Sequence, residues 1–320
     1  MKTIDRQALL KGGIAAAVAV CAVMLLLAGP GPAAPMGRES LRAASGATVE
    51  MAFEALEPGQ PLLFVLKSPE VAAAIVHFRG QTAVLRADRS AGPEPMGFLG
   101  LDLDVKPGVY PVDIQFEKKD GTIESFRREI RVQDKRFPFL KLQVPQEFVT
   151  PPASEQERIR RESEIVALLF SLTTPEWLGD GPFIAPHPVA PWPNFGQRRV
   201  TNGVLSSVHA GIDLPVPFGE PVRAVNRGRV VLASPLYFSG GTVIIDHGLG
   251  VFSFCCHLSK LFVKRGDMVE KGAVIGNCGS TGRATGPHLH WSMRVGPSRV
   301  DPYAFLALPI AAGNAAGERR

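Results

Sequence analysis

The stretch Gly286-Pro287-His288-Leu289-His290 carries the most information about this chain. Two other stretches belong with it, HAGID at 209–213 and CHLS at 256–259. Residues two apart in a β-strand project from the same face, so His288 and His290 are predicted to point into one cleft. A catalytic zinc site holds its ion with three protein ligands, such as imidazoles and a carboxylate, and leaves the fourth position for water. His209, Asp213 and His290 supply that number.

The segment around His209 and Asp213 is predicted to be a strand followed by a turn. A spacing of four also fits one face of a helix, but a glycine lies between the two residues and prolines follow at 215 and 217. The spacing alone leaves a second interpretation open, because seven histidines in 320 residues is an ordinary number. In that interpretation the histidines are structural, as we expect for those at 77, 187 and 247.

Four spaced motifs give this region a resemblance to a known family. HxGxD is matched at 209–213, GxPVxA at 219–224, HLS at 257–259 and GxTGxxTGPHLH at 279–290. In these motifs and their order, residues from about 195 to 303 resemble the LytM/lysostaphin-type zinc endopeptidases, which cut peptidoglycan cross-bridges. The resemblance covers about the last third of the chain.

The resemblance implies a role for each site residue. The zinc ligands fall on His209, Asp213 and His290, and two catalytic histidines that are not ligands fall on His257 and His288. Two positions depart from the family's pattern. Cys255 stands where members often have a tyrosine, and NGV at 202–204 stands where many have an aromatic residue. A phenol that stabilises the transition state is therefore not implied.

The implied activity is zinc-dependent hydrolysis of peptide cross-links in peptidoglycan. Zinc activates water and polarises the scissile carbonyl. One of His257 and His288 is expected to take the proton, and the other to hold the water or stabilise the oxyanion. Two alternatives remain. One is a non-catalytic LytM-like scaffold that binds the wall or activates another hydrolase, and the other is an envelope peptidase acting on proteins.

The first 35 residues are predicted to be a signal peptide or a signal anchor. Lys2, Arg6 and Lys11 precede an apolar run at 14–28, which is short for a membrane span of about 20 residues. We therefore expect export to the periplasm or cell envelope, with or without anchoring in the inner membrane. The 35 basic residues exceed the 30 acidic ones only mildly and are scattered, which argues against nucleic-acid binding.

Three of the four cysteines, Cys255, Cys256 and Cys278, lie in the catalytic region. A bond between the first two would be strained, because adjacent strand residues face opposite sides. A bridge from Cys278 to either one stays open, but buried reduced thiols are the favoured interpretation.

The chain is predicted to be all-β, apart from a helix in a linker, and to have four parts after the signal. Residues 45–135 form an immunoglobulin-like β-sandwich, since short strand-like runs alternate with turns such as Pro58-Gly59. Residues 136–194 form a linker with a helix at 154–171, where Ser154 and Glu157 fit a capping box. Residues 195–308 form the antiparallel-sheet zinc endopeptidase domain, and residues 309–320 a disordered tail. Because the sandwich carries no catalytic residue, a chain that begins near Gln143 is expected to keep catalysis on soluble substrates.

Overall fold

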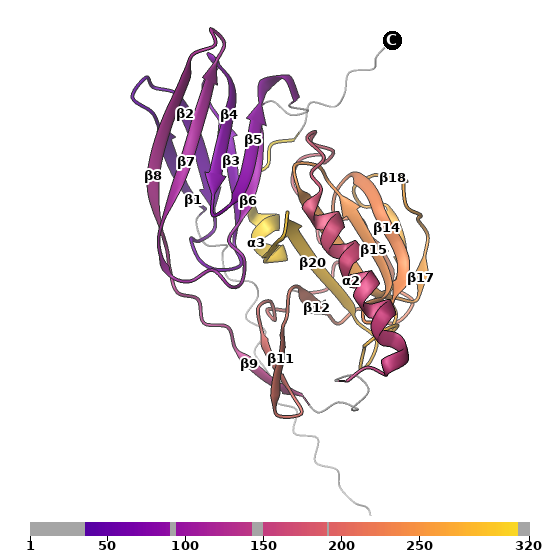
Figure 1. Cartoon of the computed structure of the whole chain (residues 1–320). Helices are drawn as coiled ribbons and strands as arrows, with labels where there is room; N and C mark the ends of the chain where they lie inside the picture. The colour runs from indigo at the N-terminus through magenta and orange to yellow at the C-terminus, as the bar shows by residue number, and fades with distance from the viewer. Residues whose placement is uncertain (1–35, 90–93, 143–149, 191, 313–320) are drawn as a thin grey trace, which may run out of the picture. The chain divides into compact units, whose positions relative to one another are not determined.

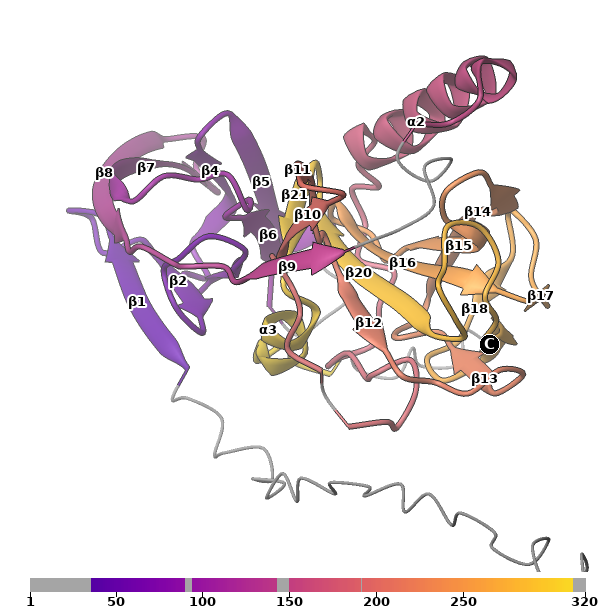
Figure 2. The same cartoon turned by 90° about the horizontal axis from the view of Figure 1, so that it is seen from below.

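The computed structural model describes residues 36–89, 94–142, 150–190 and 192–312 (Figures 1 and 2). The predicted signal at 1–35 and the end of the predicted tail lie outside these residues. The described residues belong to one compact unit. Within them, no helix is both long and apolar enough to cross a membrane.

Two four-stranded antiparallel sheets occupy the first part of the described chain. The strands of one sheet, in spatial order, are β1 (Gly37–Arg42), β2 (Thr48–Phe53), β3 (Pro61–Leu66) and β6 (Met96–Gly100). Those of the other are β5 (Gln81–Arg86), β4 (Val71–Phe78), β7 (Gly108–Lys118) and β8 (Ile123–Val132). Side chains from both sheets, including Leu62, Phe64 and Phe116, form one buried core. These residues therefore form a β-sandwich, and its immunoglobulin-like character stays a prediction.

The segment that follows contributes a strand and a helix. Strand β9 (Phe139–Leu142) pairs in parallel with β10 (Arg198–Thr201), which pairs antiparallel with β11 (Val204–Val208). Helix α2 (Gln156–Ser171) follows a 3-10 turn at Ala153–Glu155. The predicted capping box was wrong. Ser154 lies inside the 3-10 turn, and the N-cap residue Glu155 already has helical backbone angles and makes no side-chain cap.

Helix α2 packs on the C-terminal part of the chain, against residues near Tyr237 and Phe252. The ring of Phe170 is buried and lies edge-to-face against that of Phe252, with 5.4 Å between the centroids. The carboxylate of Glu162 accepts a hydrogen bond of 2.7 Å from the backbone N–H of Tyr237. The helix, which the sequence placed in a linker, therefore packs against the C-terminal part of the chain.

Residues 195–308, which the sequence predicts to be the catalytic region, are built on a seven-stranded antiparallel sheet, named the catalytic sheet after that prediction. Its path is β12 (Ile212–Leu214), β20 (Leu289–Val295), β16 (Val251–Leu258), β15 (Gly240–Asp246), β14 (Gly228–Leu236) and β18 (Met268–Val269), with β21 (Ser298–Val300) paired to β20. A smaller sheet contains β13 (Pro221–Arg223), β19 (Val274–Asn277) and β17 (Lys260–Leu261). Helix α3 (Pro302–Ala307) follows β21. The described residues are mostly β, which confirms the all-β class predicted from the sequence.

The sandwich and the catalytic sheet share a hydrophobic core. The ring of Phe98, on β6, stacks on that of Phe305 with 5.6 Å between the centroids and lies 5.4 Å from that of Trp177. The carboxylate of Asp102 forms an ion pair with the guanidinium of Arg299. Ile310, which the sequence placed in a disordered tail, is only 3% exposed and belongs to this core. The tail prediction is wrong at this residue, because its apolar side chain is buried.

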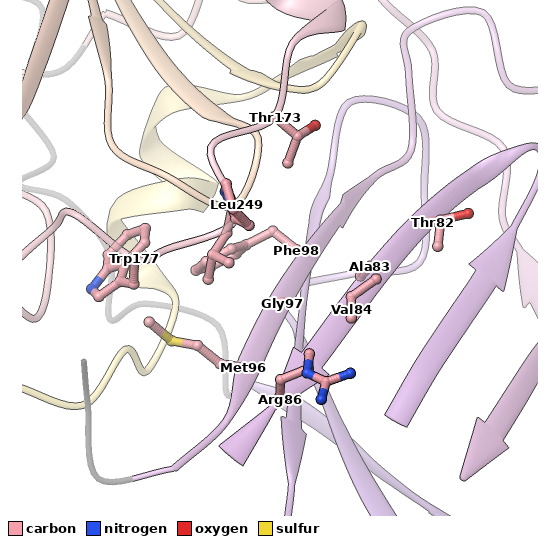
Figure 3. Close-up of a pocket in the computed structure, with 11 residues that line it drawn as sticks. Thr82, Ala83, Val84, Arg86, Met96, Gly97, Phe98, Thr173, Trp177 and Leu249 are labelled. Atoms are coloured by element: carbon pink, nitrogen blue, oxygen red, sulfur yellow. The ribbon is translucent and has the colours of Figure 1, made fainter. Parts of the chain in front are cut away.

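A cavity of about 160 Å³ lies where β5 and β6 meet the segment after α2 (Figure 3). Its walls are mainly apolar and include Met96, Trp177 and Leu249. Arg86, also in its lining, is ion-paired with Asp88. None of the five predicted site residues lines the cavity.

Candidate metal centre

The backbone brings the three predicted ligands together. Strand β12 pairs with the start of β20 so that Asp213 lies directly opposite His290. His209 comes immediately after β11, and its N–H donates to the carbonyl of Gln197 at 2.9 Å. The backbone between His209 and Asp213 runs close to β20. Gly211 permits this, because a Cβ atom at that position would lie 2.8 Å from Nε2 of His290.

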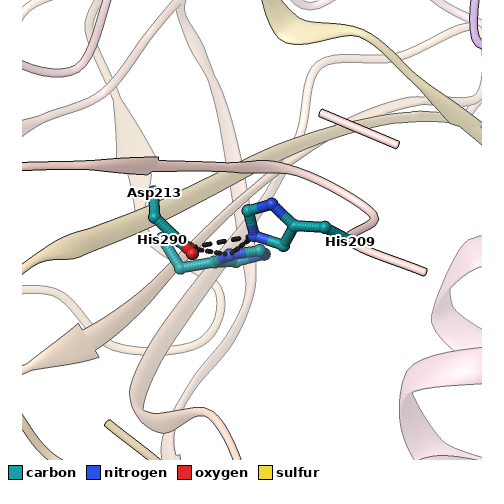
Figure 4. A group of neighbouring side chains, drawn as sticks. All are labelled: His209, Asp213 and His290. Atoms are coloured by element: carbon teal, nitrogen blue, oxygen red, sulfur yellow. Dashed lines mark hydrogen bonds and ion pairs between the residues drawn. The ribbon is translucent and has the colours of Figure 1, made fainter. Parts of the chain in front are cut away.

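The three side chains converge on one point (Figure 4). Nε2 of His209 lies 3.0 Å from Oδ1 of Asp213 and 3.0 Å from Nδ1 of His290. The latter two atoms are 2.8 Å apart. Ligand atoms around a tetrahedral zinc ion, with bonds of roughly 2.0–2.1 Å, lie about 3.3 Å from one another. This donor set therefore fits a small divalent cation after slight expansion.

Asn194 supports two of these residues through its backbone and its side chain. Its carbonyl oxygen lies 2.9 Å from Nδ1 of His209, and its side-chain oxygen accepts the N–H of Asp213 at 3.0 Å. We assign the proton of His209 to Nδ1 on this pattern, because a carbonyl oxygen can only accept. Nε2 of His209 is then unprotonated where it faces the other ligands, which is the form that binds a metal.

The charges of the group also suit a cation. Burial opposes ionisation of Asp213, but the close contacts of its carboxylate with the rings of His209 and His290 outweigh burial and hold the carboxyl pKa well below its usual range. Burial lowers the pKa of His290, and the hydrogen bond with Asp213 opposes that shift. An ionised carboxylate beside neutral imidazole is the state required for metal binding.

The two predicted catalytic histidines lie beside this group. The ring centroids of His257 and His288 are 4.6 Å apart, and Nε2 of His288 lies 3.9 Å from Oδ1 of Asp213. Nδ1 of His257 is 2.8 Å from the carbonyl oxygen of Thr281, and Nδ1 of His288 is 2.9 Å from that of Gly286. Both rings therefore donate through Nδ1, which leaves Nε2 able to accept a proton.

His257 has an unusual backbone conformation. Its φ is +61°, in the left-handed region that non-glycine residues rarely adopt, and its N–H donates to the carbonyl of Ser239 at 2.8 Å. Burial lowers the pKa of His257 to about 4, although the hydrogen bond with Thr281 opposes the shift. The ring is therefore neutral near pH 7. Strained backbone of this kind is concentrated at functional sites.

Sequence reasoning missed three supporting residues, Asn194, Arg199 and Thr281. Arg199, on β10, forms an ion pair with Oδ2 of Asp213. Thr281 belongs to the GxTGxxTGPHLH signature, which is the only signal that could have found it. The sequence points less clearly to Arg199, because it is one of two adjacent arginines and the sequence does not show which of them faces the site.

The remaining described histidines lie outside the group. His77 is exposed and bonds to the hydroxyl of Thr82 at 3.0 Å, and His187 is half-buried. His247 is buried and contacts the carbonyl oxygen of Arg227 and the hydroxyl of Ser253, each at 2.8 Å.

The three cysteines of the catalytic region are buried and form no disulfide. Burial raises the pKa of Cys255 to about 12 and that of Cys278 to about 11. The favoured interpretation of buried thiols agrees with the structure, and the bridge from Cys278 that the sequence left open is not formed.

Known proteins share the catalytic region. The sequence model of peptidase family M23 matches residues 207–302. Peptidoglycan DD-endopeptidase ShyA of Vibrio cholerae serotype O1 is 42% identical over 105 residues, which are 32% of this chain and 24% of that protein. DD-carboxypeptidase/endopeptidase Mpg of Neisseria meningitidis serogroup B is 42% identical over 115 residues, 36% of this chain and 26% of that protein. The chain thus matches about a quarter of the length of these relatives.

A solved structure extends the likeness. A crystal structure from Pseudomonas aeruginosa, described as an M23 peptidase, is 28% identical with a TM-score of 0.55. The alignment covers 78% of this chain and 95% of that one, so the shared fold reaches beyond residues 207–302. These likenesses show that the chain carries a domain of peptidase family M23, the LytM/lysostaphin-type metallopeptidases.

Proposed function

We propose that this protein is an exported zinc-dependent endopeptidase that hydrolyses peptide cross-links of peptidoglycan. The observation that carries the proposal is the convergence of His209, Asp213 and His290 beside two further imidazoles. Two imidazoles and one carboxylate are a ligand set typical of catalytic zinc. The names of the relatives, which are peptidoglycan and DD-peptide hydrolases, support the choice of substrate.

The chemistry divides between the ligands and the other two histidines. A bound Zn²⁺ would supply Lewis-acid polarisation of the scissile carbonyl and activation of the attacking water. His209, Asp213 and His290 would hold the ion. The carbonyl of Asn194 keeps His209 in the tautomer that binds a metal, and its side-chain oxygen holds the backbone at Asp213.

The proton transfers fall to His257 and His288. Each ring is oriented by a backbone carbonyl that accepts its Nδ1–H, so Nε2 faces away from that carbonyl. His257 is neutral because of its burial, so its Nε2 is unprotonated and can take the proton of the attacking water. Once protonated, an imidazole can donate from Nε2 to the oxyanion or to the leaving amine.

Export and the division of the chain are parts of the same proposal. The basic residues and apolar run of the first 35 residues support a signal or anchor and a place in the periplasm or envelope. We retain residues 195–308 as the endopeptidase domain, extended by the buried Ile310. N-terminal sequencing of the mature protein would separate cleavage from anchoring.

The experiment that tests the function is digestion of purified sacculi by the zinc-loaded protein, with the products resolved by mass. We expect soluble muropeptides whose masses correspond to opened cross-links. Binding to sacculi without any product would favour the non-catalytic scaffold. Intact sacculi together with cleaved envelope proteins would favour the protein-directed peptidase. His209→Ala serves as the inactive control.

A further inference from the structure

The two oxygens of the Asp213 carboxylate have different partners, because Arg199 binds only one of them. Oδ1 faces His209 and His290, at 3.0 and 2.8 Å from their nearest nitrogens. Oδ2 is bound by Nη2 of Arg199. Both side chains are about three-quarters buried, so solvent screens the pair less than it would at the surface. Only one carboxylate oxygen is thus directed toward the ligand group.

The strand that carries Arg199 is held on both sides. Strand β10 lies between β9 and β11, and Arg199 is opposite Leu140 of β9 and Ser207 of β11. Arg198, the preceding residue, is exposed and its guanidinium lies 5.7 Å from the centre of the Phe139 ring. Successive residues of a strand face opposite sides of the sheet, so the side chains of Arg198 and Arg199 lie on opposite faces.

A carboxylate without such a partner can rotate and offer either oxygen or both. A guanidinium has a planar array of donors on a side chain that holds its charge at every accessible pH, so it fixes the orientation of the group that it binds. Partners that orient a metal ligand commonly change metal affinity or activity by about 10–100-fold when they are removed.

We propose that Arg199 is a positioning residue that makes Asp213 a ligand through one oxygen only. The proposal rests on the proposed function, since it requires His209, Asp213 and His290 to bind a metal. A second effect has the opposite sign, because a positive charge near a cation weakens binding. Metal affinity alone therefore does not test the proposal, whereas the coordination of the metal does.

The test compares Arg199→Met with Arg199→Lys and with the control Arg198→Met. Each protein is loaded with Co²⁺, whose visible absorption is intense in four-coordinate sites and weak when the coordination number rises. For Arg199→Met we expect a weakened visible spectrum and a kcat lowered by about 10–100-fold at unchanged KM. Arg199→Lys keeps a donor and a charge, so it should recover part of both. Arg198→Met should match the wild type.

Several outcomes would overturn the proposal. An unchanged cobalt spectrum and kcat in Arg199→Met would show that Asp213 needs no partner. Tighter metal binding with an unchanged spectrum would show that Arg199 acts through its charge alone. If Arg199→Met does not fold, as judged by circular dichroism, Arg199→Lys decides, since a spectrum and kcat both equal to wild type would exclude a need for the planar guanidinium.

The same experiment separates this proposal from the proposed function. A wild-type protein that binds cobalt but releases nothing from sacculi would contradict the function and leave the spectral comparison valid. A wild-type protein that binds no cobalt would contradict both.

Discussion

The imidazoles of the site differ in which ring nitrogen meets the backbone. In His209, His257 and His288, Nδ1 contacts a backbone carbonyl oxygen, which leaves Nε2 facing the site. In His290, Nδ1 itself faces Asp213. The orientation of each ring is therefore set before any metal arrives, which lowers the reorganisation needed for binding and catalysis.

Replacing a ligand should remove both zinc and hydrolysis. His209→Ala, Asp213→Ala or His290→Ala leaves two of three protein ligands, and a site of that size loses most of its affinity. Metal analysis of each purified variant beside its turnover on muropeptides makes the measurement, with His77→Ala as the control because that residue is exposed. Full zinc content with normal turnover in any ligand variant would contradict the assignment.

Replacing a proton-transfer residue should separate binding from chemistry. His257→Ala and His288→Ala are expected to keep zinc and to lose turnover by about 10²- to 10⁴-fold, the usual contribution of a general acid or base. Zinc stoichiometry and kcat are measured on the same preparations. A metal-free variant would identify that histidine as a ligand, and full turnover in both would rule out the proton-transfer mechanism.

The five side chains that the structure brings together could be named from the sequence because each lies in a motif of fixed spacing, and their roles stay predictions. Their supporting residues could not. Asn194 acts partly through its backbone carbonyl, which every residue possesses. Arg199 reaches Asp213 only because β10 pairs with β9 and β11, and strand pairing between distant segments is not encoded in local spacing.

At the scale of elements, helix α2 illustrates what local pattern can and cannot predict. The sequence predicted a helix at 154–171, and the helix ends at Ser171 as expected. Its start differs because the chain enters through a 3-10 turn, which depends on backbone geometry after Pro152. Strand β9 was assigned to a linker, since its parallel partner lies much farther along the chain.

The packing of α2 can be tested with two substitutions in the same helix. Phe170→Ala removes a ring that is 6% exposed, so the free energy of unfolding should fall by about 3 kcal/mol. Leu168→Ala changes a side chain that is 61% exposed and should alter it by less than about 0.5 kcal/mol. Urea unfolding gives both values. Equal effects would mean that the helix does not pack on the sheet in solution.

At the scale of the whole molecule, the shared core changes an expectation drawn from the sequence. A chain that begins at Gln143 seemed able to keep catalysis because the sandwich has no catalytic residue. The structure shows that such a chain also loses β9, the stacking of Phe98 on Phe305 and the ion pair between Asp102 and Arg299.

We therefore expect the truncated chain to be less stable and less active than the full chain, even on soluble muropeptides. Exposure of Phe305 and Trp177 to water removes apolar burial that supports the catalytic sheet. Thermal unfolding and turnover of the two proteins, measured side by side, test this. Equal Tm and equal kcat would restore the view of two independent domains.

Acid should destabilise the fold partly through His247. Burial lowers the pKa of this histidine to about 4 in the folded state, against about 6.5 when unfolded. The unfolded chain therefore takes up the proton first. The contribution of the buried, neutral His247 to the free energy of unfolding is fully present above about pH 6.5. It is lost as the pH falls toward 4, and the total loss is about 3 kcal/mol.

The comparison that isolates this contribution uses His247→Gln, which removes the titrating ring but can still form hydrogen bonds. Urea unfolding at pH 7 and pH 4.5, with a chelator present throughout, gives the free energy of unfolding of each protein. The variant should lose less stability than the wild type over this interval. An equal loss would assign the acid sensitivity to other groups.

The three unbonded thiols in the catalytic region bear on how this protein can mature. The described cysteines form no disulfide, so folding of this domain needs no disulfide bond to be made or exchanged among them. On the proposed zinc dependence, the domain needs its metal to become active, but no disulfide among the described cysteines has to form first.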